Sequence, residues 1–373
     1  MPGLFIQRQA EALAKKNTVQ VISVHPDPGC NGKYEPVHTV ENNVTVCRVY
    51  YRYAKKPGVL SALVHFLRYV KAHHLGYKSL EPFTVDIVHG HIFTREIFFA
   101  WFMARKQKRP YIISEHWSRY FLGNGTYQGF IRKWLTRKLL KKSSGLITVS
   151  ESLLQAMKDA KLIHAKSFIV PNVIDVNAFV PPVSKPGEGK AVILHVSCFE
   201  NRSKNISGFL EAVAEIFKYR TDFRVLLTGD GPDRIAMQNY ARSLGLNEQQ
   251  VEFTGLKQNT ELIQLYQSAS FLVQSSHYET FGTVVVEALA CGLPVVSTNT
   301  GVASAVINNS NGIIIQQPSV REIVRGTEQM LNIYPTFEMN KLHESVVGMF
   351  SENTIAKQLI GIYREIIYTW QKD

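Results

Sequence analysis

The sequence lacks several features that mark common functional classes. Its 373 residues contain only four cysteines, Cys30, Cys47, Cys198 and Cys291, without a C-x-x-C spacing, so neither a disulfide framework nor a zinc site is indicated. The twelve histidines form no H-E-x-x-H motif. No apolar run reaches the roughly 18 residues of a membrane helix, and the first residues lack a signal-peptide pattern. We therefore expect a metal-free, cofactor-free protein in a reducing, cytoplasmic setting.

Length and composition predict two globular domains. A chain of 373 residues is too long for one ordinary core. Hydrophobic residues make up 45% and charged residues 19%, which is typical of globular proteins. Residues 177–190 are rich in proline and glycine and predict a linker. We therefore expect domains at residues 1–176 and 191–350, followed by a C-terminal helix at residues 351–373.

The net charge of +12 is concentrated in the first half. Through Val180 there are 26 Lys+Arg against 11 Asp+Glu, whereas the remainder has 16 against 19. The segment Phe130–Lys142 places Phe130, Trp134 and Leu135 among six basic residues. It predicts either a helix on an anionic membrane surface or an ordinary amphipathic helix with a solvated basic face. No nucleic-acid-binding motif accompanies the charge, so no nucleic acid partner is expected.

Both halves alternate apolar strand patterns with helical patterns. Repeated β-α units predict an α/β fold with doubly wound parallel sheets, whose ligands bind beyond the carboxyl ends of the strands. Strands are predicted at residues 19–25, 44–51, 85–91, 110–116, 145–150 and 167–172 in the first half, and at 191–197, 223–229, 251–255, 270–276, 294–298 and 312–316 in the second.

The segment at residues 277–298, HYETFGTVVVEALACGLPVVST, is the most informative part of the chain. Gly282 allows a ligand to approach the backbone, and the helix expected from Thr283 offers unpaired N–H groups to an anion. Glu279 on the loop and Glu287 on the helix would then bracket that anion from different sides. The alternative is that Glu279 is a solvated loop residue and Glu287 an ordinary helix-surface carboxylate.

This block, E-x7-E followed by A-L-A-x-G-x-P-V-V-S/T, resembles the retaining family 4 glycosyltransferases of GT-B fold. The resemblance implies two Rossmann-like domains facing a cleft and a nucleotide diphosphate sugar as donor. It implies that Glu287 binds the ribose, that Glu279 acts catalytically on the sugar, and that Phe281, Gly282 and Thr283 lie at the diphosphate. It also implies that no metal is needed.

The segment SCFENRSKNISG resembles the part of the family that grips the diphosphate. Lys204 matches the family's lysine, and a cation there would neutralise the departing diphosphate. Cys198 stands where the family has an arginine, which puts this grip in doubt, although Arg202 could reach in from the loop. The alternative interpretation of Lys204 is a solvated loop lysine.

The remaining candidate residues lie at other predicted strand ends. The resemblance places the turn Gly229–Asp230 close to the nucleotide and Gly255–Leu256 near the base. His116 resembles a cleft histidine that helps to position the sugar or the acceptor, and a histidine can relay a proton near neutral pH. A lone histidine at a strand end is otherwise a structural residue.

The beginning of the chain departs from the family pattern. Family members have a central strand before the helix that residues 3–16 predict here. We therefore expect either that the true start lies upstream or that the first domain lacks this strand.

The resemblance implies a retaining, metal-independent hexosyltransferase in cell-surface polysaccharide biosynthesis. Its acceptor would be a glycan or a lipid-linked acceptor. The basic first half of the chain predicts that a lipid-linked acceptor is reached at the inner face of the cytoplasmic membrane. A sugar-nucleotide epimerase of the same architecture and a degenerate, non-catalytic nucleotide-sugar binder are the alternatives. An acceptor requirement separates the transferase from the epimerase, and binding without turnover would identify the degenerate binder.

Overall fold

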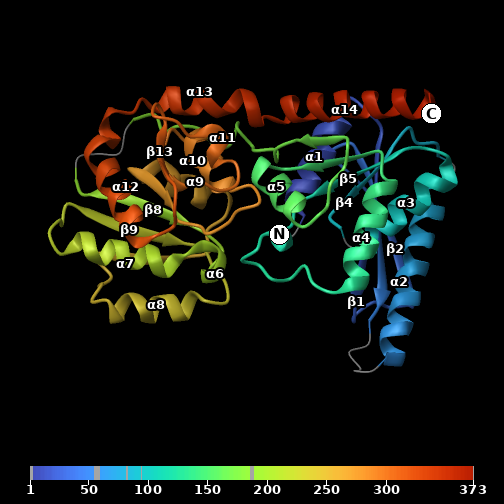
Figure 1. The fold of residues 1–373 in the computed structure, drawn as a ribbon, viewed down its shortest axis with the longest axis horizontal. Coiled ribbons are helices and arrows are strands. Elements are labelled where there is room, and N and C mark those ends of the chain that lie inside the picture. Colours follow the sequence, from blue (N-terminus) through green and yellow to red (C-terminus); the bar gives the residue numbers. More distant parts are fainter. Residues whose placement is uncertain (1–2, 54–58, 81–82, 94, 185–188, 373) are drawn as a thin grey trace. The chain divides into compact units, whose positions relative to one another are not determined.

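The chain forms two compact units, shown in Figure 1. They comprise Met1–Ile113 with Ala356–Asp373, and Ser114–Ile355. The predicted α/β class with parallel sheets is confirmed, whereas the predicted domain limits stay a prediction. Part of the predicted linker, residues 185–188, lies outside the described residues. The structure is a computed structural model that describes residues 3–53, 59–80, 83–93, 95–184 and 189–372.

The first unit contains a three-stranded sheet of order β1-β3-β2. Strand β1 runs parallel to β3, while β2 and β3 form an antiparallel hairpin. Its two-residue turn, Asn42–Asn43, has φ angles of 47° and 67°, as a type I′ turn requires. The elements are α1 (Leu4–Ala14), β1 (Val19–Asp27), β2 (Tyr34–Glu41), β3 (Val44–Arg52), α2 (Val59–Ser79), β4 (Val88–His91) and α3 (Arg95–Gln107).

The strands of the first half thus do not form one sheet. A separate four-stranded sheet has the order β4-β5-β6-β7, and the division between the units falls within β5 (Tyr111–Glu115). The last helix, α14 (Glu352–Lys372), belongs to the first unit from Ala356 onward. There the hydroxyl of Tyr363 lies 2.6 Å from His89 Nδ1.

The second unit contains a six-stranded parallel sheet of order β10-β9-β8-β11-β12-β13. From β8 the chain adds β9 and then β10 on one side. It then returns to the other side of β8, where it adds β11, β12 and β13 in turn. The topological switch point, where α/β sheets bind their ligands, therefore lies between β8 and β11. The strands are β8 (Ala191–Val196), β9 (Phe223–Thr228), β10 (Val251–Gly255), β11 (Phe271–Gln274), β12 (Val295–Thr298) and β13 (Gly312–Ile315).

Helices cover both faces of this sheet (Figure 1), and every residue of β11 and β12 is buried. Among the described residues, no helix is both long and apolar enough to cross a bilayer. The remaining elements of the unit are η1 (Ser118–Tyr120), α4 (Phe130–Lys142), β6 (Gly145–Thr148), α5 (Glu151–Asp159), β7 (Ser167–Ile169), α6 (Asn201–Lys204), α7 (Ile206–Phe217), α8 (Arg234–Ser243), α9 (Asn259–Ser268), α10 (Thr283–Ala290), α11 (Ala303–Val306), α12 (Val320–Ile333), η2 (Tyr334–Thr336) and α13 (Met339–Phe350).

Candidate active site

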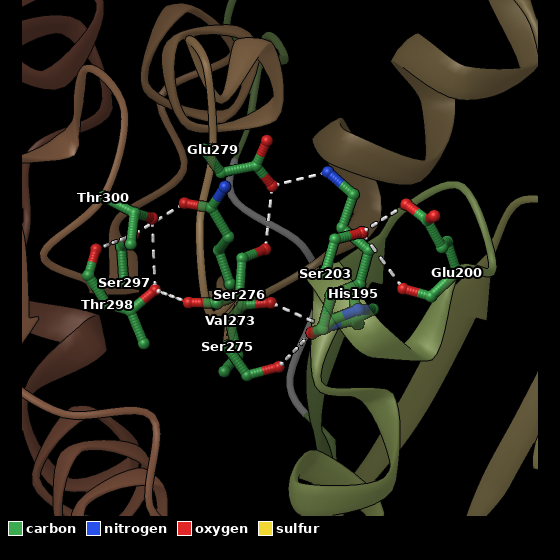
Figure 2. A network of polar contacts seen from close by, with 12 residues as sticks. His195, Glu200, Ser203, Val273, Ser275, Ser276, Glu279, Ser297, Thr298 and Thr300 are labelled. Carbon is green, nitrogen blue, oxygen red and sulfur yellow. Dashed lines mark hydrogen bonds and ion pairs between the residues drawn. The ribbon is translucent and has the colours of Figure 1, made fainter. Parts of the chain in front are cut away.

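A part-buried ion pair spans the switch point. Lys204, which follows β8, donates from Nζ to Glu279 Oε1 over 2.6 Å, and Glu279 follows β11. The side chains are only 17% and 11% exposed. Ser276 Oγ donates to the same carboxylate oxygen over 2.8 Å, while the other oxygen points away from these partners (Figure 2). Glu279 is therefore held through one oxygen and presents the second for other contacts.

Lys204 is a cation in this setting. Burial by itself would lower its pKa, but the charge of Glu279 and the hydrogen bond with Glu279 raise it above the ordinary value of 10.5. A positive charge is thus fixed beside a carboxylate at the carboxyl end of the sheet. The same place in an α/β fold suits an anionic ligand.

Hydrogen bonds fix the short helix α6, which ends at Lys204, to the loop that carries Glu279. Ser203 Oγ donates to the backbone and side-chain oxygens of Glu200 over 3.1 and 2.8 Å (Figure 2). Ser275 Oγ donates to the Lys204 carbonyl over 3.1 Å, and the His277 amide donates to the Ser203 carbonyl over 2.8 Å. The ion pair is therefore supported on both sides of the switch point.

Gly282 precedes α10 and brings backbone close to the ion pair. Its φ is 82°, a left-handed conformation that favours glycine. A Cβ at this position would lie 3.1 Å from Gln274 Nε2 and 3.7 Å from Glu279 Cγ. The first N–H groups of a helix lack intrahelical partners, so the amides at the start of α10, from Thr283 onward, favour an anion. Phe281, by contrast, is a core residue whose ring packs edge-on against Phe350.

Glu287 lies on the second turn of α10 and is partly buried. Tyr266 on α9 donates its hydroxyl to Glu287 Oε2 over 3.0 Å. The two predicted carboxylates therefore differ in their surroundings. Glu279 accepts from the Lys204 ammonium and the Ser276 hydroxyl, and Glu287 accepts from the Tyr266 hydroxyl.

The turn after β9 packs tightly against the segment after β8 and is hydrogen-bonded to the end of β10. Gly229 has φ 134°, and a Cβ there would lie 1.9 Å from the Ser197 carbonyl oxygen. Its amide donates to the Gly255 carbonyl over 2.9 Å. Asp230 accepts from the Gly231 amide over 2.9 Å. The side chain of Leu256, which follows Gly255, is 58% exposed.

The residues near the predicted diphosphate grip are solvent-accessible. Cys198 is exposed at the end of β8. The Arg202 side chain is 55% exposed and lies 3.9 Å from Glu200 Oε1. Within the described ranges, no group of three or more His, Cys, Asp or Glu side chains is placed to hold a metal ion.

His116 is buried in the segment that follows β5. Its amide donates to Glu115 Oε1 over 2.8 Å, as does the Trp117 amide over 2.9 Å. Tyr120 donates its hydroxyl to Glu115 Oε2 over 2.8 Å. Glu115, which sequence reasoning did not single out, therefore fixes the backbone on which His116 sits.

Comparison with known proteins assigns the chain to a family. Residues 3–178 match the family described as Glycosyltransferase Family 4, and residues 178–343 match Glycosyl transferases group 1. The chain belongs to the family 4 glycosyltransferases. The predicted resemblance and GT-B fold are confirmed.

This family 4 chain has low sequence identity to its relatives and to the solved structures that it resembles. It is 24% identical, over 75% of its length and 62% of the relative's, to a phosphatidylinositol N-acetylglucosaminyltransferase protein of Arabidopsis thaliana. The chain spans 47–62% of the length of the first curated relatives it matches. Sucrose-phosphate synthase of Thermosynechococcus elongatus has a TM-score of 0.76 at 19% identity, covering 99% of this chain and 94% of that one. Anabaena HepE in complex with UDP and glucose has a TM-score of 0.68 at 17% identity, covering 86% of each chain.

Two supporting residues of this family 4 glycosyltransferase could not be found from local patterns. Ser150 Oγ donates to the Thr280 carbonyl over 2.5 Å, directly beside Glu279, and also caps α5. Tyr266 reaches Glu287 from a different helix. Ser150 gives a weak signal as a helix cap after a strand, and Tyr266 resembles an ordinary core tyrosine.

Proposed function

We propose that the protein transfers a hexose-type sugar from a nucleotide diphosphate sugar to a glycan or lipid-linked acceptor. Configuration would be retained, no metal would be needed, and the product would serve cell-surface polysaccharide biosynthesis. The observation that carries this proposal is the ion pair of Lys204 and Glu279 across the switch point, beside Gly282. The likeness to Anabaena HepE, which was solved with UDP and glucose, supports a UDP-sugar as the first donor to test.

Each group has a role that its position supports. Lys204 and the first amides of α10 would hold the diphosphate and stabilise the charge that develops on it. Glu279 would accept from the sugar hydroxyls, Glu287 would accept from the ribose, and His116 would serve the acceptor side. The anomeric carbon exchanges its bond to the diphosphate oxygen for one to the acceptor oxygen. The acceptor proton passes to the departing diphosphate.

The experiment that tests this function is a donor screen followed by an acceptor screen. UDP-, GDP- and ADP-sugars are tested for thermal stabilisation and slow donor hydrolysis, and the selected donor is then offered to lipid and glycan extracts. We expect Glu287→Ala to weaken donor binding and Glu279→Ala to nearly abolish transfer. Wild-type rates in both variants would contradict the assignment.

The same screen separates the two alternatives. An epimerase would convert the nucleotide sugar without any acceptor. A degenerate binder is favoured by one observation, the exposed Cys198 at the position of the family's arginine. It would be stabilised by the donor and yet show no turnover on any acceptor.

We further propose that α4 places the enzyme on an anionic membrane surface, at the inner face of the cytoplasmic membrane. Thr136, Leu139 and Leu140 are buried, while the side chains of Phe130 and Ile131 are 83% and 76% exposed. The helix contains six basic residues and no acidic one. Exposed rings and aliphatic groups among cations are suited to a layer of anionic headgroups above acyl chains. The name of the Arabidopsis relative, which includes phosphatidylinositol, supports a lipid acceptor.

Sedimentation with vesicles tests the membrane surface. We expect binding to phosphatidylglycerol vesicles, weak binding to phosphatidylcholine vesicles, and release as salt rises, because the Debye length falls from about 10 Å at 0.1 M to about 3 Å at 1 M. Phe130→Ser should reduce binding. Trp370→Ser removes another exposed aromatic residue, at 38% exposure, and serves as the matched control. Binding that ignores both salt and Phe130→Ser would contradict the proposal.

A further inference from the structure

Tyr266 is a fully buried residue whose polar atom reaches a candidate ligand-binding carboxylate. Its side chain has no exposed surface, and its ring packs edge-on against Phe179 with centroids 5.9 Å apart. Its hydroxyl donates to Glu287 Oε2 over 3.0 Å. The hydroxyl belongs to α9 and the carboxylate to α10, so the contact ties the two helices at this carboxylate.

The Tyr266 hydroxyl keeps its proton at neutral pH. Burial and then the charge of Glu287 raise the pKa of Tyr266 well above its ordinary value. Burial, followed by the same charge, also raises the pKa of the nearby Cys291 thiol to about 12. At neutral pH the Tyr266 hydroxyl therefore donates and Glu287 Oε2 accepts.

We infer that Tyr266 is a positioning residue that orients the Glu287 carboxylate for the ribose of the donor, which rests on the proposed function. A glutamate side chain at a helix surface has several rotamers, and ordering it on binding costs affinity. The Tyr266 hydroxyl holds one oxygen and thereby sets the direction of the other. Tyr266 does not touch the donor itself.

The test compares ribose and deoxyribose ligands. Affinities of UDP, 2′-deoxy-UDP and 3′-deoxy-UDP are measured by calorimetry for the wild type, Tyr266→Phe and Glu287→Gln. We expect Tyr266→Phe to weaken UDP about tenfold, the effect of one oriented hydrogen bond. The affinity for the deoxy ligand that lacks the Glu287 contact should change less than about twofold, and kcat at saturating UDP-sugar should be maintained. The preference for ribose would thus fall about tenfold.

The chain offers a matched control in a second tyrosine–glutamate pair. Tyr240 on α8 donates its hydroxyl to Glu211 on α7 over 2.6 Å. Tyr240→Phe removes the same kind of interhelical hydrogen bond away from the switch point, so it should leave the ribose preference unchanged. An equal loss of preference in Tyr240→Phe would show a general structural effect and overturn the inference.

The remaining outcomes are also decisive. If Glu287→Gln abolishes the ribose preference and Tyr266→Phe leaves it intact, Tyr266 has no positioning role while the proposed function stands. If Glu287→Gln keeps the preference, the ribose contact itself is wrong and the inference falls with it. Should Tyr266→Phe fail to fold, 4-aminophenylalanine and 4-methylphenylalanine at this position fill the same volume with and without a donor. Only the amino variant should keep the preference, and equal preferences in both would overturn the inference.

Discussion

Replacing Glu279 by glutamine tests whether this carboxylate, in the protein without ligand, lies beside Lys204 where the diphosphate of the donor would bind. Glu279→Gln keeps the shape and hydrogen-bonding capacity of the side chain but removes its charge. The Lys204 side chain, which is 17% exposed in the native protein, would lose the carboxylate that lies 2.6 Å from its ammonium. The variant should therefore have a lower free energy of unfolding without ligand. An added anion should stabilise it more than it stabilises the native protein.

The magnitude follows from the burial of the pair. Removing one partner of a buried ion pair costs about 3–5 kcal/mol, and the residual exposure of both side chains places this pair near the lower end, at about 3 kcal/mol. For a unit of this size, that loss lowers the unfolding midpoint by about 6–12 °C. If a bound diphosphate recovers half of it, the affinity for UDP increases about tenfold. Sugar transfer should fall steeply in the same variant.

The assay combines thermal unfolding with and without UDP, calorimetry, and transfer rates at neutral pH. A raised lysine pKa contributes stability that is complete below the ordinary value of 10.5 and is lost only as the pH rises through the folded-state value. The full contribution of Lys204 is therefore present under these conditions. Tighter UDP binding together with lost transfer would show that Glu279 acts as the counter-ion of Lys204. If Glu279 were only a contact to the ligand, its replacement would weaken UDP binding instead.

A second lysine–glutamate pair provides the control. Glu338 and Lys341 lie 2.7 Å apart, but their side chains are 65% and 71% exposed. Glu338→Gln should cost less than about 1 kcal/mol and leave UDP binding unchanged. Unchanged stability in Glu279→Gln, or weaker binding of UDP by that variant, would refute the reasoning.

Three further predictions concern the same sheet. Gly229→Ala should lower the free energy of unfolding in urea by more than about 3 kcal/mol, because its Cβ would collide with the Ser197 carbonyl at 1.9 Å. Lys204→Met should weaken UDP binding and reduce kcat by about 10²-fold or more, measured in the transfer assay. Burial lowers the pKa of His195 to about 4 from its ordinary value of 6.5, so the unfolded chain binds a proton between these values and the folded protein does not. The free energy of unfolding should fall by about 3 kcal/mol from pH 6.5 to 4. His195→Asn keeps a donor for the Val273 carbonyl but does not titrate, so denaturant titrations of this variant should lack that part of the loss.

The apolar strands were predictable because their signal is local. All six strands of the large sheet and six of the first half were expected close to where they lie. Strand β2 was missed. It contains Pro36, alternates exposed with half-buried residues, and pairs only with β3, so it has the weak pattern of an edge strand.

The chemistry of the site was predictable only in part. The spacing of Glu279 and Glu287 and the place of Lys204 indicated the charged groups, because these residues belong to a recognisable segment. Their partners come from distant parts of the chain: Tyr266 is 21 residues from Glu287, and Ser150 is 130 residues from Thr280. Such contacts depend on how strands and helices pack, and no local pattern specifies them.

The two carboxylates of the site share a construction that the spacing between them does not reveal. Each is held by a hydroxyl donor from another position, Ser276 for Glu279 and Tyr266 for Glu287. Glu279 also has a cation beside it, Lys204, supplied from across the switch point. A hydroxyl orients a carboxylate without changing its charge, whereas the Lys204 ammonium places a positive charge beside Glu279. Losing a hydroxyl should therefore affect which ligand is preferred, and losing a charge should affect whether transfer occurs.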